Sequence, residues 1–179
     1  QVGQIVATVE DAIKQNETNV LFPFDVCGAF SQGYIGYHLQ NAISEELARR
    51  NINKPVATII TQVVVDKNDK GFQNPTKPIG SFYSKEIAEK LEKEQGYIMK
   101  EDAGRGYRRI VASPKPIDVI EKNTIKHLVD SGNIVISCGG GGIPVIKEGS
   151  EVKGVAAVID KDFAAEKLSE TLDAYCLLI

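Results

Sequence analysis

The chain has 179 residues, 42% of them hydrophobic, and its 21 basic and 24 acidic residues give a net charge of -3. This length and composition suit one domain with a buried core, and the slightly acidic balance argues against nucleic-acid binding. No apolar run approaches the roughly 20 residues that a membrane span needs, so no membrane partner is expected. Three scattered cysteines form no metal motif, and their odd number favours a reducing, cytoplasmic setting; two histidines argue against a His-based metal site.

Each end of the sequence interrupts a pattern. Apolar residues recur at helical spacing over residues 2–13, directly at the start, and the apolar run 175–179 closes the chain. We therefore expect residues 1–179 to form one domain that is incomplete at both ends.

A second helix is expected between Asp25, a good N-cap, and Arg50. Its second half places apolar residues four positions apart, whereas its first half contains Gly28, Gly33 and Gly36. Each glycine inside a helix costs up to about 1 kcal/mol relative to alanine. The glycines therefore indicate that another backbone approaches closely, and the alternative is a kinked or broken helix start.

Residues 56–65 are rich in β-branched side chains and predict one long buried strand, which can continue into a protruding arm. Turn residues follow at 66–71. Over residues 72–83 the chain reads FQNPTKPIGSFY, and the prolines on either side of Lys77 predict an irregular, semi-rigid loop. Such a loop holds Lys77 toward a ligand; the alternative is an ordinary solvated lysine.

Ser84 is expected to begin a short helix, and residues 97–99 and 107–111 to form the strands of a hairpin. Charged residues gather near the turn of this hairpin: Glu101, Asp102, Arg105, Arg108 and Arg109. Salt bridges among them favour a structural role over the binding of an anion. We expect residues 67–116 to form a small subdomain inserted in the main domain.

Asn123 or Thr124 is expected to cap a helix that stops at Gly132, and a buried strand follows from residue 134. Four consecutive glycines come after that strand: Gly139, Gly140, Gly141 and Gly142. Ligands in open α/β sheets lie beyond the carboxyl ends of strands, and glycines leave backbone N–H groups accessible. A phosphate is the expected ligand, and the alternative is a tight turn that binds nothing. The residues after the glycines fit neither a P-loop nor a dinucleotide-binding motif.

The last helix is expected to be capped by Asp162, after a hairpin-like return at residues 148–149. Lys161 stands just before this helix, where the helix dipole disfavours a cation. An anion bound beside Lys161 explains its position. Together with Lys77 and the glycines, Lys161 completes a set of donors without an evident nucleophile. Such a set suits phosphoryl transfer, in which positioning and charge neutralisation provide most of the catalysis.

Six segments resemble the carbamate kinases of the amino-acid-kinase superfamily: CGAFSQGYIGY, TQVVVD, FQNPTKPIG, EDAGRGYRR, SCGGGGIPV and AVIDKDFAAEKL. The resemblance implies an α/β fold, a three-layer αβα sandwich with a mostly parallel central sheet and a small protruding α+β subdomain. It also implies phosphoryl transfer between ATP and carbamate, which gives ADP and carbamoyl phosphate, with Mg²⁺ and usually in arginine catabolism. A homodimer through the helix at 25–50 is implied as well.

By the same resemblance, Lys77 contacts the carbamoyl phosphate side and Lys161 contacts the transferring phosphoryl group. Asp162 resembles the carboxylate that organises the active-site lysines, and Gly139 to Gly142 approach the nucleotide. An amino-terminal GGNA loop and a carboxyl-terminal nucleotide-binding half of the family have no counterpart in this sequence. Two alternatives therefore stay open: a sibling kinase that makes carbamoyl phosphate or phosphorylates another small carboxylate, and a non-catalytic remnant that binds an anion or a nucleotide.

Overall fold

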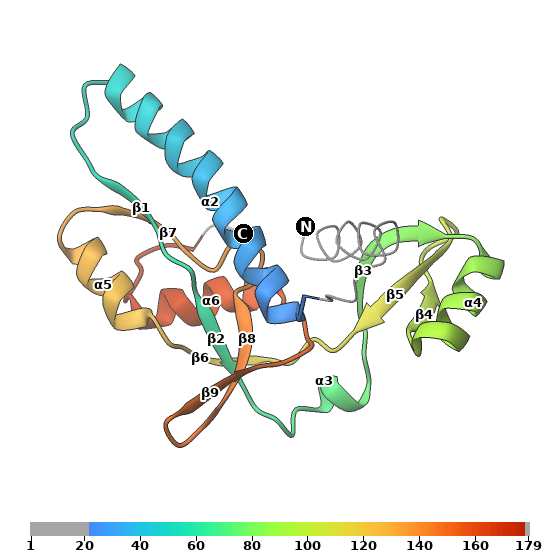
Figure 1. Cartoon of the computed structure of the whole chain (residues 1–179). Helices are drawn as coiled ribbons and strands as arrows, with labels where there is room; N and C mark the ends of the chain where they lie inside the picture. The colour runs from blue at the N-terminus through green and yellow to red at the C-terminus, as the bar shows by residue number, and fades with distance from the viewer. Residues whose placement is uncertain (1–21, 178–179) are drawn as a thin grey trace.

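The computed structural model describes residues 22–177, which form a larger and a smaller lobe (Figure 1). The helix expected over residues 2–13 lies outside the described residues. None of the helices within residues 22–177 has the length and hydrophobicity needed to cross a bilayer.

The long helix α2 spans Phe24–Arg49 and confirms the helix expected at residues 25–50. Its N-cap is Pro23, so the cap expected at Asp25 is wrong. The Asp25 carboxylate lies instead against Gly154, where a Cβ atom would overlap it. Gly36 packs directly against the Thr58 side chain, whereas Gly33 has no described atom within 4 Å of its Cβ position. A side chain, and not the expected backbone, therefore makes the close approach at Gly36.

The β-branched segment forms two strands rather than one: β1, Val56–Thr58, and β2, Gln62–Val65. The break falls at Thr61, which is fully buried. The Gln32 side chain on α2 accepts a hydrogen bond from the Thr61 N–H at 2.8 Å and donates one to the Thr61 carbonyl at 3.0 Å. Because the Thr61 N–H bonds to a helix side chain instead of a neighbouring strand, the strand is interrupted there.

The strands of the larger lobe form two sheets. β1 pairs in parallel with β7, Ile134–Ile136. β2 lies inside a second sheet with the order β6 (Pro116–Val119), β2, β8 (Ile143–Glu148), β9 (Glu151–Gly154). In this sheet only β2 and β8 pair in parallel. The four-stranded sheet is therefore mixed, and not mostly parallel as expected of the central sheet, because β9 is the return strand of the hairpin and β6 enters from the smaller lobe.

The two faces of β2 pack against different helices. Val63 and Val65 belong to a buried cluster with α5, Lys122–Asp130, and α6, Lys161–Thr171, whereas Val64 packs with residues of β8 and α2. This alternation follows from the two-residue period of a strand. Complete burial of one such side chain contributes about 1.5–3 kcal/mol. Helices consequently lie on both faces of this sheet.

The start of α5 differs from the expectation. Its N-cap is Glu121, and neither Asn123 nor Thr124 caps it. The Glu121 carboxylate accepts hydrogen bonds from the backbone N–H and the side-chain amide of Gln62, at 2.7 Å and 2.9 Å. Glu121 therefore ties the beginning of α5 to β2.

The smaller lobe holds an antiparallel sheet in the order β3 (Lys77–Tyr83), β5 (Tyr107–Val111), β4 (Ile98–Glu101), with a helix beside it (Figure 1). β4, Ile98–Glu101, and β5, Tyr107–Val111, confirm the expected hairpin. The helix α4 spans Lys85–Gln95, and the side chain of its N-cap, Ser84, accepts a hydrogen bond from the helix, as expected.

Residues 72–83 are more regular than the expected loop. A short helix α3, Lys70–Gln73, is followed by the strand β3, Lys77–Tyr83. Among the described strands β3 is an edge strand that pairs only with β5, and an edge strand tolerates Pro78 because one of its sides needs no donor. Lys77 is thus the first residue of a strand and not part of an irregular loop.

Salt bridges form at the hairpin turn as expected. Asp102 contacts Arg105 at 3.2 Å and Arg108 at 3.3 Å. Arg109 has a different environment, since its guanidinium lies over the Tyr97 ring, 3.6 Å from the centroid. Neighbouring arginines on β5 therefore face opposite sides of the strand.

Candidate functional site

A cavity of about 420 Å³ lies between the two lobes. The smaller lobe lines it with Arg108 and with the start of β3, including Lys77. The larger lobe lines it with Gly140 and with three consecutive residues at the start of α6: Asp160, Lys161 and Asp162. The structure thus brings together Lys77, Lys161 and Asp162, which the sequence had indicated separately.

Lys77 and Asp160 join the lobes at this cavity. The Lys77 Nζ donates a hydrogen bond to the Asp160 Oδ2 at 2.7 Å. The side chains are 34% and 31% exposed, so solvent screens this pair less than it screens a pair on the open surface. The hydrogen bond from Lys77 lowers the pKa of Asp160 below its usual range, so the carboxylate stays ionised at neutral pH.

Asp160, not the expected Asp162, is the N-cap of α6. Its Oδ1 accepts a hydrogen bond from the Asp162 N–H at 3.0 Å, while its backbone is still extended. One carboxylate therefore caps the helix with one oxygen and holds Lys77 with the other. The expectation for Asp162 is wrong because this residue already lies inside the helix, where its N–H is the group being capped.

Lys161 is the first residue of α6, and its ammonium pairs with the Asp162 carboxylate. The hydrogen bond with Asp162 raises the pKa of Lys161, so the ammonium keeps its charge. Its side chain is 67% exposed. An anion in the cavity therefore meets two ammonium groups together with the positive end of the α6 dipole.

The four glycines occupy different environments. Gly139, Gly141 and Gly142 have positive φ angles of 48°, 137° and 83°. A Cβ atom at Gly141 would overlap the carbonyl of Ile159, and one at Gly142 would overlap Val63. These glycines therefore allow the loop to pack on the core. Gly140 has no atom of the described residues near its Cβ position, and it alone of the four lines the large cavity.

The backbone donors of this loop are mostly used inside the chain. The N–H of Gly139 bonds to Ser137, and the N–H groups of Gly141 and Gly142 bond to Cys138. Within residues 22–177 the N–H of Gly140 has no such partner. The loop thus offers one backbone donor to a ligand.

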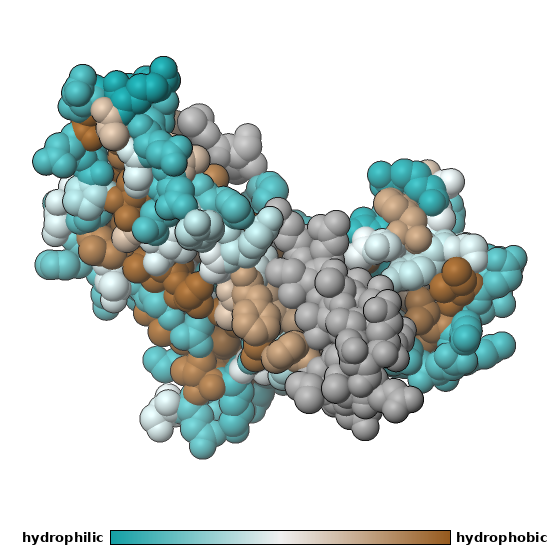
Figure 2. All heavy atoms as spheres, turned by 45° about the horizontal axis from the view of Figure 1, so that its top comes forward, coloured by the Kyte–Doolittle hydropathy of each residue, from teal (hydrophilic) through white to brown (hydrophobic). Residues whose placement is uncertain are grey.

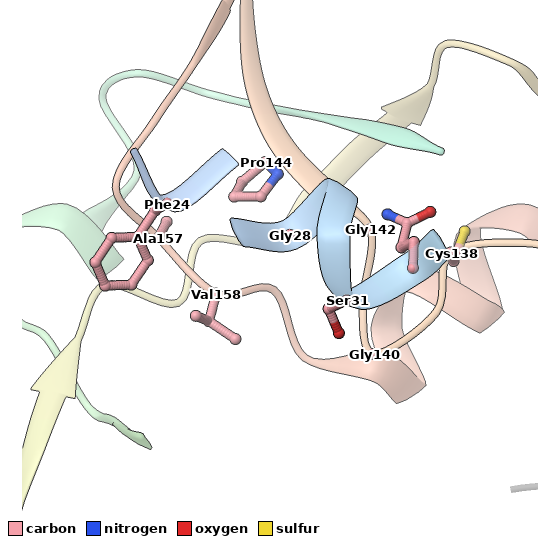
Figure 3. Close-up of a pocket in the computed structure, with 10 residues that line it drawn as sticks. Phe24, Gly28, Ser31, Cys138, Gly140, Gly142, Pro144, Ala157 and Val158 are labelled. Carbon is pink, nitrogen blue, oxygen red and sulfur yellow. The ribbon is translucent and has the colours of Figure 1, made fainter. Parts of the chain in front are cut away.

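Ser31 of α2 stands beside Gly140. It lines both the large cavity and a smaller neighbouring one of about 20 Å³, and in Figure 3 its side chain lies next to the Gly140 loop. Although Ser31 is only 2% exposed, it faces these cavities from the helix. Its hydroxyl adds a neutral donor at the larger-lobe side of the site.

Cys138 precedes the glycines and is not a reactive thiol. Its backbone has a φ of 60°, and its N–H donates to the Thr61 hydroxyl at 3.0 Å. Burial raises the pKa of Cys138 to about 11. Because the thiolate is the nucleophilic form, Cys138 is a poor nucleophile at neutral pH.

Three residues of the site escaped the sequence analysis: Ser31, Arg108 in this role, and Asp160. Asp160 had a usable signal, because an Asp directly before a helical pattern is a common N-cap. The charged hairpin indicated anion binding by Arg108 as an alternative, but the structural role was favoured there. Ser31 had no signal, because its neighbours in the cavity lie far away in sequence and a lone serine is usually a surface residue.

Comparison with known proteins shows which proteins the chain is similar to. No protein-family model matches the chain. A carbamate kinase from Clostridium perfringens is 71% identical over 179 residues, which is 100% of this chain and 57% of that protein. The chain is homologous to the carbamate kinases. The resemblance seen in the six sequence segments is thereby confirmed.

Solved structures agree with this homology. Carbamate kinase from Giardia lamblia bound to citric acid superposes with a TM-score of 0.87 at 42% identity, over 97% of this chain and 55% of that one. The same enzyme bound to AMP-PNP gives a TM-score of 0.78 over 97% of this chain and 54% of that one. The chain therefore shares the mixed α/β fold of the carbamate kinases and spans little more than half the length of these relatives.

Proposed function

We propose that the full protein containing this chain is a carbamate kinase, which interconverts ATP and carbamate with ADP and carbamoyl phosphate. One observation carries the proposal: in a homologue of these kinases, Lys77 and Lys161 come from different lobes and line one cavity. The cavity supplies charge and backbone donors. Phosphoryl transfer needs those groups and asks little covalent chemistry of the protein.

In this proposal the two lysines have separate tasks. Lys161 neutralises the phosphoryl group in transfer, and Lys77 binds on the carbamoyl phosphate side. Asp160 and Asp162 hold these ammonium groups by the ion pairs described above. Ammonium groups fixed before the reaction stabilise the charge that spreads over the phosphoryl oxygens without having to reorganise.

We infer that the nucleotide is ATP or ADP. The Giardia lamblia enzyme, which was solved with AMP-PNP, supports this choice. Gly140, whose N–H has no partner in the described part of the chain, is the member of the Gly139–Gly142 loop placed to contact a phosphate. No group of His, Cys, Asp or Glu within residues 22–177 forms a metal cluster.

Mg²⁺ still fits these residues, because it usually binds nucleotide phosphates together with only one or two carboxylates. Asp162, whose side chain is 45% exposed at the cavity, is the carboxylate best placed to hold it. Bound there with the nucleotide, Mg²⁺ would supply charge neutralisation at the phosphates.

We further propose an architecture and a cellular setting for the full protein. Residues 67–116 form a lid that carries Lys77 to the substrate, and the main domain of the full protein is a three-layer αβα sandwich. Helices on both faces of the β2 sheet support the layered arrangement. The enzyme is cytoplasmic and serves arginine catabolism.

We also propose a homodimer that forms through α2. Three aromatic residues of this helix are roughly half exposed or more: Phe30, Tyr34 and Tyr37. Hydrophobic surface runs along the lobe that carries this helix, below a hydrophilic tip (Figure 2). Such a face is better explained by a partner than by solvent.

An assay that compares two phosphoryl donors tests the proposed function. The full protein is given ADP, Mg²⁺ and either carbamoyl phosphate or acetyl phosphate, and the ATP formed is measured. We expect ATP formation at least ten times faster with carbamoyl phosphate. A faster rate with acetyl phosphate would indicate a kinase for another small carboxylate. Binding of phosphate without ATP formation from either donor would indicate a non-catalytic anion-binding protein.

A further inference from the structure

Arg108 has a feature that the hairpin salt bridges do not explain. It lines the same cavity as Lys77 and Lys161. Its Nη1 reaches Asp102 at 3.3 Å, and its guanidinium lies over the Phe82 ring, 5.1 Å from the centroid. Within residues 22–177 its buried Nε has no hydrogen-bond partner. A buried charged group with an unused donor is unfavourable, and here it stands at the wall of a cavity suited to anions.

We propose that Arg108 recognises the planar carboxyl-derived end of the substrate, namely the carboxylate of carbamate and the carbonyl that it becomes in carbamoyl phosphate. This inference rests on the proposed function and extends it to substrate specificity. An ammonium is a point charge that suits a phosphoryl group. A guanidinium is a flat fork that matches the two oxygens of a planar carboxylate.

The surroundings of Arg108 orient it for this task. Asp102 fixes one end of the guanidinium, and the ring of Phe82 lies against its face. Its side chain is 22% exposed, so it is well sheltered from solvent. The adjacent Arg109 lies over Tyr97 on the other side of the strand and is not among the residues that line the cavity.

The hairpin offers a matched control in Arg105. This residue contacts the same two partners, with Asp102 at 3.2 Å and the Phe82 ring centroid at 4.9 Å. Its side chain, however, is 63% exposed and does not line the cavity. If the arginines only stabilise the hairpin, removing either of them should have similar effects. If Arg108 binds the substrate, only its removal should change binding.

The test compares Arg108→Met and Arg105→Met in the full protein by calorimetry, with carbamoyl phosphate and inorganic phosphate as separate ligands. We expect Arg108→Met to raise the Kd for carbamoyl phosphate about 10- to 100-fold, the scale for a lost hydrogen bond to a charged group. Its Kd for inorganic phosphate should change less than twofold. Arg105→Met should leave both constants within twofold, and Arg108→Lys should recover only part of the loss.

Binding is measured apart from turnover, so the two proposals fail in different ways. If the protein binds carbamoyl phosphate but forms no ATP, the proposed function fails. The Kd values then still test whether Arg108 binds the substrate. The proposed role of Arg108 is refuted if Arg108→Met weakens the binding of both ligands equally or of neither. The role is also refuted if Arg105→Met raises the Kd for carbamoyl phosphate as much as Arg108→Met does. Absence of carbamoyl phosphate binding by the unmodified protein would refute both proposals.

Discussion

Lys77 and Asp160 are 83 positions apart in the sequence, yet the Lys77 Nζ lies 2.7 Å from the Asp160 Oδ2. The same carboxylate caps α6 through its other oxygen. The start of the edge strand β3 and the start of α6 are therefore fixed to one another through a single side chain. As a result, the position of Lys77 relative to Lys161 depends on how the helix begins.

Two substitutions at Asp160 separate its roles. Asp160→Ser keeps a capping oxygen but removes the partner of Lys77, whereas Asp160→Ala removes both. We expect the free energy of unfolding of Asp160→Ala to be about 1 kcal/mol lower than that of Asp160→Ser, which is the usual contribution of an N-cap. Both variants should raise the KM for carbamoyl phosphate. Urea denaturation and steady-state kinetics measure these effects; equal stabilities would exclude a capping role, and an unchanged KM would exclude the positioning of Lys77.

The ion pair also predicts a dependence of stability on pH. The hydrogen bond from Lys77 lowers the pKa of Asp160 in the folded protein. A lowered carboxyl pKa stabilises the fold above the unfolded pKa of about 3.9, and this stabilisation is lost as the pH falls through the folded value. The unmodified protein should therefore lose stability more steeply below about pH 4 than Lys77→Met does. Parallel curves of unfolding free energy against pH would contradict this account.

Local patterns predicted the elements whose causes are local. The apolar spacing after Gly33 predicted α2, Ser84 predicted the start of α4, and the residues around Glu148 predicted the β8–β9 hairpin. In each case the residues within a few positions along the chain determine the backbone conformation of the element. Capping, turn chemistry and periodicity act over that same distance.

The features that the sequence did not reveal depend on distant partners. The break between β1 and β2 is caused by Gln32, which is 29 positions from Thr61. Asp160 is next to Lys161 in the sequence, but its partner Lys77 is 83 positions away and reaches it only through the placement of β3. The glycines predicted a phosphate loop, but their packing against Val63 and Ile159 accounts for Gly141 and Gly142. Such contacts follow from the tertiary arrangement, which no local pattern in this sequence contains.

Replacement of Lys161 tests the phosphoryl-binding role. Lys161→Met removes an ammonium that lines the cavity and should lower turnover by about 10²-fold, the scale for loss of one preorganised electrostatic donor. Lys167→Met is the matched control, because Lys167 lies on the same helix and pairs with Glu170 at 2.6 Å, and it is not among the cavity-lining residues. Steady-state rates of ATP formation compare the two. Near-normal turnover in Lys161→Met would remove Lys161 from the mechanism.

Two glycines of the loop should respond differently to alanine. Gly142 has a φ of 83°, and a Cβ atom there would overlap Val63 in the core. We expect Gly142→Ala to lower the free energy of unfolding by about 1–3 kcal/mol, as in overpacked cores. Gly140 has open space at its Cβ position, so Gly140→Ala should stay within about 0.5 kcal/mol. Similar losses in both variants, measured by urea denaturation, would show that the packing of Gly142 is not the deciding factor.

Residues 67–116, proposed above to form a lid, should be less stable than the core sheet. Ala88 is the only buried residue of α4, and β4 has no buried residue, so this part of the segment has few contacts to protect it. β2 lies between two paired strands, with three of its four residues buried. Few buried contacts give low local stability, and lids are drawn from such regions. Amide hydrogen exchange should therefore be faster across residues 84–109 than across residues 62–65.

Adding carbamoyl phosphate and ADP to the full protein should slow exchange across residues 84–109, because a ligand held by Lys77 and Lys161 joins the two lobes. ADP alone is the control, since it lacks the carbamoyl group and should slow exchange less. Exchange at residues 62–65 should not change with either addition, because these residues already lie inside the core sheet. Equal protection of the two regions, unaffected by ligand, would mean that the segment is an integral part of the domain and that closure does not deliver Lys77 to the substrate.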